Sequence, residues 1–228
     1  MRTRKVGAGF LWYRRDMTTL FCLDFDETLS NTDRLRAELE AAIDTIGGKD
    51  LLLAYKNAYE QVRKEQGTVR MPLVIRDTAA QFGIGSDLHR QLANILHSLP
   101  YHEYIYPGAT ELITRLKERG QVVVFSDGDA FYQAEKIQSS PVADLVDAVV
   151  ILPNKVDYFA ELEGYWPADR YVFVDDKQRV LDAAKLFFGD KAITVLVKQG
   201  RYAENGEPSA DIVVSNIGEV AERFLTLN

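Results

Sequence analysis

The sequence predicts an α/β protein with a mostly parallel sheet and an all-helical segment inserted after the first strand. From residue 105 onward, short apolar runs rich in β-branched residues alternate with helical patterns, which is typical of βαβ units. Residues 31–104 carry helical periodicity only, and one further apolar run, residues 20–25, precedes them. Connections between parallel strands are right-handed, so these observations predict a Rossmann-like core made from two separated parts of the chain.

The first apolar run carries two acidic residues at its end. Leu20, Phe21 and Leu23 are continuous enough for a strand buried on both faces. Asp24 and Asp26 are two positions apart, so the period of a strand predicts that they point to the same side. Two buried carboxylates are costly without a compensating cation, and open α/β sheets bind ligands at the carboxyl ends of their strands. The pair therefore indicates a metal or phosphoryl site, with a strand that ends in solvated acids as the alternative.

Helical spacing continues through residues 31–104. The first stretch has Leu35, Leu39 and Ile43 on one face and stops at Gly47-Gly48. Three further stretches are bounded by Gly67, Gly83 and Pro100, which predicts four helices in all.

Polar residues also end two later strands of the predicted sheet. We expect strands near 121–126, 147–152, 171–174, 193–197 and 211–214, with helices between them. Ser126 ends the first of these and Asp175-Asp176 end the third, while Lys155 begins a helix just before it. Because parallel strands end at the same edge of a sheet, these residues are expected near Asp24 and Asp26.

Composition limits the function classes and the cellular setting. The 228 residues carry a formal charge of −7, which argues against a nucleic-acid or anionic-membrane partner. A single cysteine, Cys22, excludes an intrachain disulfide and fits a reducing compartment, so we expect a cytoplasmic protein with no membrane segment. Residues 1–16 are basic and are expected to be an extension ahead of Met17, with a targeting segment as the alternative. The oligomeric state stays open.

Four motifs in order resemble those of one enzyme superfamily. DFDET at 24–28, VVVFS at 122–126, Lys155 and FVDD at 173–176 are similar to the four motifs of the haloacid dehalogenase (HAD) superfamily. The chain is identified as a member of its phosphatase-like branch, although Glu27 stands where glycine is commoner. The resemblance implies a HAD-like core at 17–30 and 105–228, a helical cap at 31–104 and the extension at 1–16.

The resemblance also implies catalytic roles. Asp24 would be the nucleophile that forms an aspartyl-phosphate, and Asp26 would act as general acid and then as general base. Ser126 would donate a hydrogen bond to a phosphoryl oxygen, and Lys155 would neutralise negative charge. Lys136 is a competitor for this last role, and its mid-helix place ranks it lower.

A metal site follows from the same resemblance. Asp24, Asp26 (also through its backbone carbonyl), Asp175 and Asp176 would surround Mg²⁺, which prefers hard oxygen ligands. Val180 and Leu181 stand where the family often has Asn and Asp.

The function expected from these features is Mg²⁺-dependent hydrolysis of a small phosphorylated metabolite. Alternatives that share the residues are a phosphomutase or phosphotransferase and a non-catalytic module that binds a phospho-ligand. A 2-haloacid dehalogenase is disfavoured, because Asp26 is present where the dehalogenases lack an acid. Basic residues of the helical segment are candidates to contact an anionic substrate: Arg63, Lys64, Arg70, Arg76 and Arg90.

Overall fold

A six-stranded parallel sheet forms the centre of the protein. The computed structural model describes residues 18–82, 86–200 and 208–225, so the expectation for residues 1–16 lies outside the described residues. The strand order is β3-β2-β1-β4-β5-β6, and all five neighbouring pairs run parallel. The strands are β1 (Thr19–Leu23), β2 (Gln121–Asp127), β3 (Ala148–Leu152), β4 (Arg170–Asp175), β5 (Ala192–Val197) and β6 (Ile212–Val214). The predicted fold class is confirmed.

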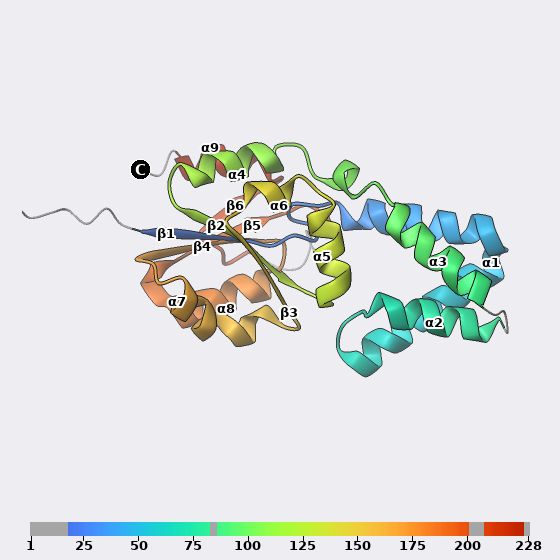
Figure 1. Ribbon diagram of the computed structural model, residues 1–228. Coiled ribbons are helices and arrows are strands. Elements are labelled where there is room, and N and C mark those ends of the chain that lie inside the picture. The colour runs from blue at the N-terminus through green and yellow to red at the C-terminus, as the bar shows by residue number, and fades with distance from the viewer. Residues whose placement is uncertain (1–17, 83–85, 201–207, 226–228) are drawn as a thin grey trace, which may run out of the picture.

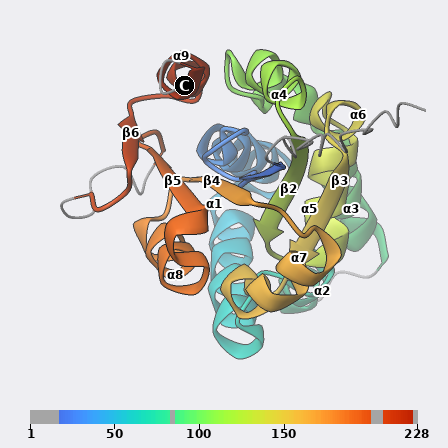
Figure 2. The same cartoon turned by 90° about the vertical axis from the view of Figure 1, so that its left-hand side faces the viewer.

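Helices cover both faces of this sheet. On one face lie α4 (Ala109–Lys117) and α9 (Gly218–Leu225), and on the other lie α7 (Phe159–Tyr165) and α8 (Gln178–Phe188) (Figures 1 and 2). The shorter α6 (Val142–Leu145) packs against α4 and against α5 (Ala130–Gln138). The result is a three-layer arrangement in which the middle residues of the central strands are buried.

The apolar sequence of β1 follows directly from this burial on two sides. Phe21 and Leu23 belong to the hydrophobic core under α4 and α9, whereas Leu20 and Cys22 belong to the core under α7 and α8. All four side chains are at most 2% exposed. A strand with both faces covered has no position for a polar residue, which explains why the run is continuous rather than alternating.

The segment between β1 and β2 forms a separate helical layer beyond the end of the sheet, which we call the helical insert (Figure 1). It contains α1 (Thr32–Gln66), α2 (Met71–Gln81) and α3 (Ser86–Ser98), and these pack around a hydrophobic core of their own. Gly48 has a positive φ of 70° and kinks α1, so the first two predicted helices appear as one bent helix. The exact division into cap and core domains stays a prediction. No helix in the described parts of the chain is long and apolar enough to cross a membrane.

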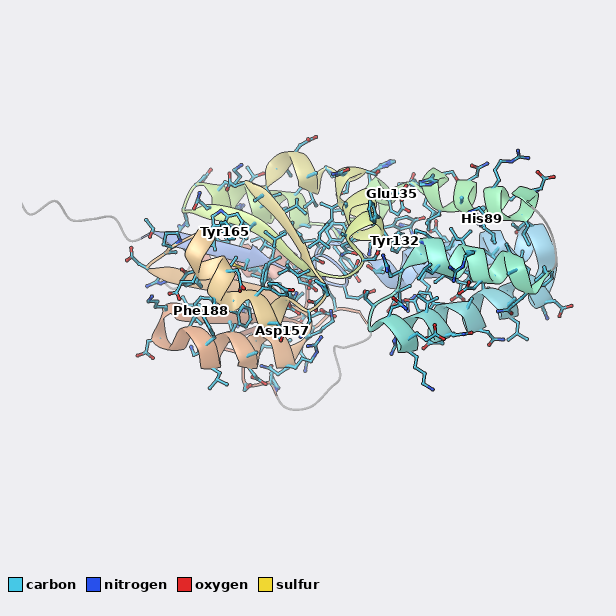
Figure 3. All side chains as sticks on the ribbon, turned by 60° about the horizontal axis from the view of Figure 1, so that its bottom comes forward. His89, Tyr132, Glu135, Asp157, Tyr165 and Phe188 are labelled. Atoms are coloured by element: carbon cyan, nitrogen blue, oxygen red, sulfur yellow. The ribbon has the colours of Figure 1, made fainter. Side chains whose placement is uncertain are left out.

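Helix α5 is where the core meets the insert. Figure 3 shows Tyr132 and Glu135 of this helix on the side that faces the insert. Tyr132 packs against the core of the insert, and Glu135 contacts the ring of His97 from α3. An ion pair between Arg70 and Asp129, 3.6 Å apart, joins the insert to the residue that caps α5.

We predict that Gly120→Ala destabilises the protein, because a Cβ at this position would lie 2.2 Å from the carbonyl oxygen of Thr19. Forcing an atom against backbone costs about 1–3 kcal/mol of folding free energy. Gly164→Ala in α7 is the matched control, since a Cβ there meets no atom within 4 Å and alanine favours helix. Urea denaturation of both variants would show a lower midpoint for Gly120→Ala alone. Equal midpoints would contradict the packing argument.

Candidate active site

The strand that leads into the site ends one residue before the first aspartate. β1 stops at Leu23, and the amide of Asp24 makes one more hydrogen bond, to the carbonyl of Val174 at 2.9 Å. The chain then turns, with the carbonyl of Phe25 accepting hydrogen bonds from the amides of Leu29 and Ser30. Asp24 and Asp26 therefore lie in a loop and have different neighbours. The same-side prediction assumed that both residues belong to the strand, and this premise is wrong because β1 ends at Leu23, while the direction of the two side chains stays a prediction.

Glu27 holds this turn in an uncommon backbone conformation. Its φ of 59° lies in the left-handed region, which costs a side-chain-bearing residue roughly 1–2 kcal/mol. The side chain is 3% exposed and accepts a hydrogen bond from the hydroxyl of Tyr106 at 3.1 Å. Its amide donates to the carbonyl of Ser30 at 2.8 Å, which closes the turn. These contacts explain how glutamate occupies a position where glycine would be free of strain.

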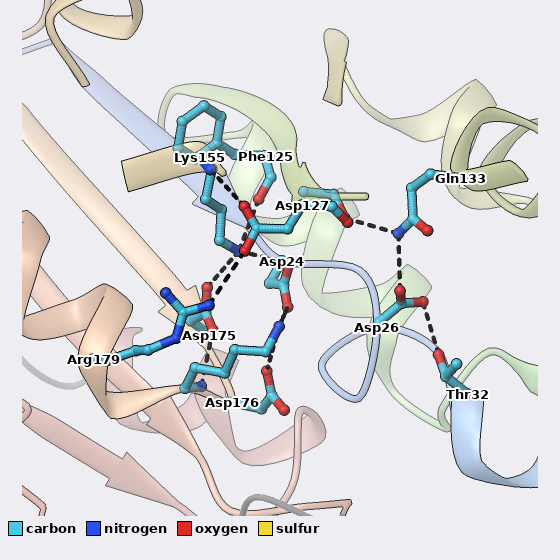
Figure 4. Close-up of polar contacts among 12 residues, drawn as sticks. Asp24, Asp26, Thr32, Phe125, Asp127, Gln133, Lys155, Asp175, Asp176 and Arg179 are labelled. Carbon is cyan, nitrogen blue, oxygen red and sulfur yellow. Dashed lines mark hydrogen bonds and ion pairs between the residues drawn. The ribbon is translucent and has the colours of Figure 1, made fainter. Parts of the chain in front are cut away.

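Lys155 joins the ends of three strands. It begins a short 3-10 helix (Lys155–Tyr158), and its side chain is 1% exposed. Its Nζ lies 2.7 Å from Oδ1 of Asp24 and 2.6 Å from Oδ2 of Asp175, and it donates to the carbonyl of Phe125 at 3.1 Å (Figure 4). Burial alone would lower the pKa of Lys155, but the carboxylates of Asp175 and Asp24 outweigh it and raise the pKa, so the side chain stays an ammonium.

Three buried carboxylates gather beside this ammonium, and we call them the acid cluster: Asp24, Asp175 and Asp176. One oxygen of each lies within 4.8 Å of the others. Oδ2 of Asp24 and both carboxylate oxygens of Asp176 accept no hydrogen bond from any residue that the structure describes. Burial, followed by the charges of Asp24 and Asp175, raises the pKa of Asp176 to about 9. Buried oxygens without donors are costly, so this cluster suits an added cation.

Asp26 lies outside the acid cluster and has a different set of partners. Nζ of Lys136 lies 2.5 Å from its Oδ1, and the hydroxyl of Thr32 donates to the same oxygen at 2.8 Å. Burial raises the pKa of Asp26, but the nearby charge of Lys136 and the two hydrogen bonds outweigh it and hold the pKa below its ordinary value. The predicted role as general acid needs a protonated carboxyl. The geometry described here favours an ionised Asp26, which is suited to accept a proton.

Gln133 joins Ser126 to the carboxylate of Asp26. The side-chain amide of Gln133 donates to Oγ of Ser126 at 2.8 Å and to Oδ2 of Asp26 at 3.2 Å. Both side chains are almost fully buried. Ser126 therefore lies between the end of β2 and Asp26, close to the positions that the sequence predicted, and its hydroxyl can turn toward a ligand.

A cavity of about 170 Å³ lies between the core and the helical insert and contains Asp26. Its polar and aromatic lining includes Asp26, Thr32, Arg36, Tyr59, Tyr132 and Lys136. This volume suits a small molecule or a small group of a larger one.

Arg36 is a lining residue that the sequence reasoning missed. Of the basic residues singled out in the helical segment, none lines the cavity, and Arg70 instead pairs with Asp129. Arg36 follows Thr32 by four positions on α1, so both lie on the same helix face. The four-residue spacing from Thr32, the first residue of α1, is the sequence signal that would have identified Arg36 as a lining residue.

Comparison with solved structures relates the chain to one hydrolase family. A crystal structure from Burkholderia xenovorans LB400, assigned as a haloacid dehalogenase-like hydrolase, is 31% identical, covers 90% of this chain and 98% of its own, and superposes with a TM-score of 0.82. No protein-family model matches the sequence, and comparison with curated proteins finds no match.

More distant structures share the fold. The L-2-haloacid dehalogenase of Xanthobacter autotrophicus is 16% identical, with a TM-score of 0.62, and the match covers 93% of this chain and all of that one. The YfnB protein of Bacillus subtilis, assigned as a HAD hydrolase and bound to magnesium, is 13% identical, with a TM-score of 0.63 and coverage of 92% and 100%.

These structures correct the function expected from the sequence. The assignment to phosphomonoester hydrolysis rested on disfavouring a 2-haloacid dehalogenase, yet several of the similar structures are 2-haloacid dehalogenases. The physical reason is that a buried carboxylate nucleophile on this fold can attack carbon as well as phosphorus, so the motif residues do not by themselves select the electrophile. The phosphohydrolase assignment is therefore replaced by the coarser one of a hydrolase.

The similarity to the Burkholderia protein extends over nearly the whole of both chains. The parallel sheet and the buried contact between Asp24 and Lys155 agree with the motifs found in the sequence. This chain belongs to the haloacid dehalogenase-like hydrolases.

Proposed function

We propose that this protein is a hydrolase that works through a covalent ester on the carboxylate of Asp24. The observation that carries the proposal is the state of that carboxylate, which is 2% exposed and fixed through Oδ1 by Lys155. Its Oδ2 receives no hydrogen bond from the described residues, so its lone pairs can attack an electrophile. A carboxylate that is desolvated and oriented in this way is a competent nucleophile.

The reaction would proceed in two steps. Oδ2 of Asp24 forms a bond to the electrophilic atom while the leaving group departs with its bonding electrons. Water then hydrolyses the ester, and the ionised carboxylate of Asp26 is suited to accept the proton of that water. Lys155 keeps a positive charge beside the carboxylate in both steps, which stabilises the carboxylate that the second step regenerates.

We also propose that the helical insert acts as a cap over this site and helps to select the substrate. Both parts of the chain line the cavity next to Asp26, with Arg36 and Tyr59 from the insert and Lys136 from the core. A lid of this kind would keep bulk water away from the ester between the two steps.

The first test is covalent labelling of Asp24. We expect Asp24→Asn to lose turnover by at least about a thousandfold, because the substitution removes the nucleophile at nearly constant volume. Mass spectrometry of acid-quenched wild-type protein should show an adduct on the peptide that contains Asp24. Asp44→Asn, at an exposed position of α1, is the control that should keep both turnover and adduct. Turnover retained in pure Asp24→Asn would contradict the covalent mechanism.

The same experiment separates the substrate classes. A 2-haloacid, as used by the Xanthobacter enzyme, and an aryl phosphate are compared by the release of chloride or of phosphate. In ¹⁸O-water, hydrolysis at the ester carbonyl would place the label in Asp24 during a single turnover, whereas attack at phosphorus would place it in phosphate. The absence of an adduct with every substrate tested would count against the proposed function itself.

We further propose that the acid cluster holds a divalent cation, with Mg²⁺ the best match to its oxygen ligands. Support comes from the three buried oxygens of Asp24 and Asp176 that accept no hydrogen bond from the described residues. When bound, Mg²⁺ supplies positive charge beside the nucleophile. The side chain of Asp26 does not belong to the cluster, and its backbone carbonyl stays a predicted ligand.

We predict that Asp176→Asn raises the melting temperature of the metal-free protein at pH 7 to 8. Because the pKa of Asp176 is raised to about 9, the folded state binds this proton more tightly than the unfolded chain, whose value is about 4. The free energy of unfolding of the wild type therefore falls progressively as the pH rises from about 4 to about 9. Asp176→Asn has no such carboxyl group, so this fall is absent in the variant. We expect the melting temperature to rise by a few degrees, because each kcal/mol of unfolding free energy shifts it by ~2–4 °C.

Thermal melts in EDTA from pH 4 to pH 9 would measure this gain. The gain in melting temperature should be small at pH 4 and largest at pH 8 to 9. Added Mg²⁺ should raise the melting temperature of Asp176→Asn by less than that of the wild type. Asp190→Asn, which removes an exposed carboxylate, is the control. A lower melting temperature for Asp176→Asn over the whole pH range would contradict the argument.

A further inference from the structure

A second lysine reaches the acid cluster from the residue directly after Asp176. Nζ of Lys177 lies 3.8 Å from Oδ2 of Asp24 and 3.9 Å from Oδ1 of Asp176. These two oxygens are among those that accept no hydrogen bond from the described residues. We propose that Lys177 is a built-in counter-cation that competes with a divalent cation for the oxygens of Asp24 and Asp176. This inference rests on the proposed metal site and concerns how that site is regulated.

The charge of the cluster explains why a competing cation is needed. Three buried carboxylates carry up to three negative charges, and Lys155 supplies one positive charge through short contacts to Asp24 and Asp175. Asp176 makes no such short contact with Lys155 within the described residues, so its ionised form, the form that a metal would bind, depends on another cation. Lys177 supplies that second positive charge when no metal is present, and it does so on the side of the cluster that a metal would use.

The distances between the Lys177 ammonium and the carboxylates indicate that the ammonium can move away from the acid cluster. Its distances of 3.8 and 3.9 Å to the oxygens of Asp24 and Asp176 are longer than charge-assisted hydrogen bonds of about 2.7–2.9 Å, so its attraction to the acid cluster is mainly Coulombic. The side chain is 21% exposed, whereas that of Lys155 is 1% exposed. The four-carbon stem of Lys177 can therefore swing its ammonium into solvent.

The backbone of Lys177 is fixed independently of its side chain. Its amide donates to Oδ1 of Asp175 at 2.9 Å, and the residue occupies the position immediately before α8. Movement of the ammonium thus needs no change in the turn that carries Asp175 and Asp176. A divalent cation would have to displace the Lys177 ammonium, so the lysine weakens metal binding and stabilises the metal-free site.

The test compares Lys177→Met with wild type by titration calorimetry with MgCl₂ and with MnCl₂. We expect Lys177→Met to bind each metal at least about tenfold more tightly, because a positive charge about 4 Å from the shared oxygens is removed. In EDTA the same variant should melt at a lower temperature than wild type, and saturating Mg²⁺ should raise its melting temperature by more degrees.

Two further variants make the result specific. Lys177→Arg keeps the charge and should bind metal no more tightly than wild type. Lys191→Met removes an exposed lysine that pairs with Glu163, far from the cluster in the fold, and should leave metal affinity unchanged. Lys177→Gln replaces Lys177→Met if the methionine variant does not fold, and the same affinities are expected.

Each outcome decides a different part of the argument. If wild type binds metal but Lys177→Met binds it with equal or lower affinity, the proposed competition is wrong and the metal site is still supported. No binding of Mg²⁺ or Mn²⁺ to either protein at millimolar concentration overturns both the competition and the metal site. Covalent labelling of Asp24 is measured separately, so failure of the proposed hydrolase chemistry is distinguished from either result.

Discussion

The buried contact between Lys155 and the carboxylates of Asp24 and Asp175 is the interaction on which the site depends. It joins the loop after β1, the end of β4 and the carbonyl of Phe125 in β2 through a single ammonium. Loss of one partner from such a pair leaves an uncompensated buried charge, which typically costs about 3–5 kcal/mol. Lys155 enters from the chain after β3, so the contact joins segments that are far apart in the sequence. The carboxylate of Asp24 is therefore oriented by the sheet as a whole and by no single local segment.

Two aspartates only two positions apart acquire different chemistry from their partners. Asp24 shares its ammonium with another carboxylate and keeps one oxygen without a hydrogen-bond donor among the described residues. Asp26 has an ammonium of its own from Lys136, a hydroxyl from Thr32 and an amide from Gln133. The separation arises because β1 ends at Leu23, which frees the next residues to turn toward α1 and α5.

Much of the fold and of the site could be predicted from the sequence. Both depend on local hydrophobic patterns and on the rule that parallel strands end at the same edge of a sheet. The six strands, their direction and the meeting of Asp24, Ser126, Lys155 and Asp175 follow from those two facts. Arg36, Lys136 and Lys177 could not be ranked in the same way, because a lysine or arginine on a helix or turn carries no signal of where its long side chain ends. The end of β1 was placed too far along the chain because the last residue of a strand depends on hydrogen bonds to β4, which the sequence of β1 does not contain.

The relation between family and reaction rests on the same geometry. A desolvated carboxylate with a fixed lysine lowers the cost of covalent attack whether the electrophile is carbon or phosphorus, so the buried centre alone is neutral toward substrate class. Selection must come from groups that differ between sites on the same fold. Here the candidates are the residues that line the cavity between core and insert. The proposed competition between Lys177 and a metal at the acid cluster would contribute to the same selection. A site whose negative charge is compensated by its own lysines needs less from a metal, whereas a site that binds the metal gains charge to stabilise an anionic substrate oxygen.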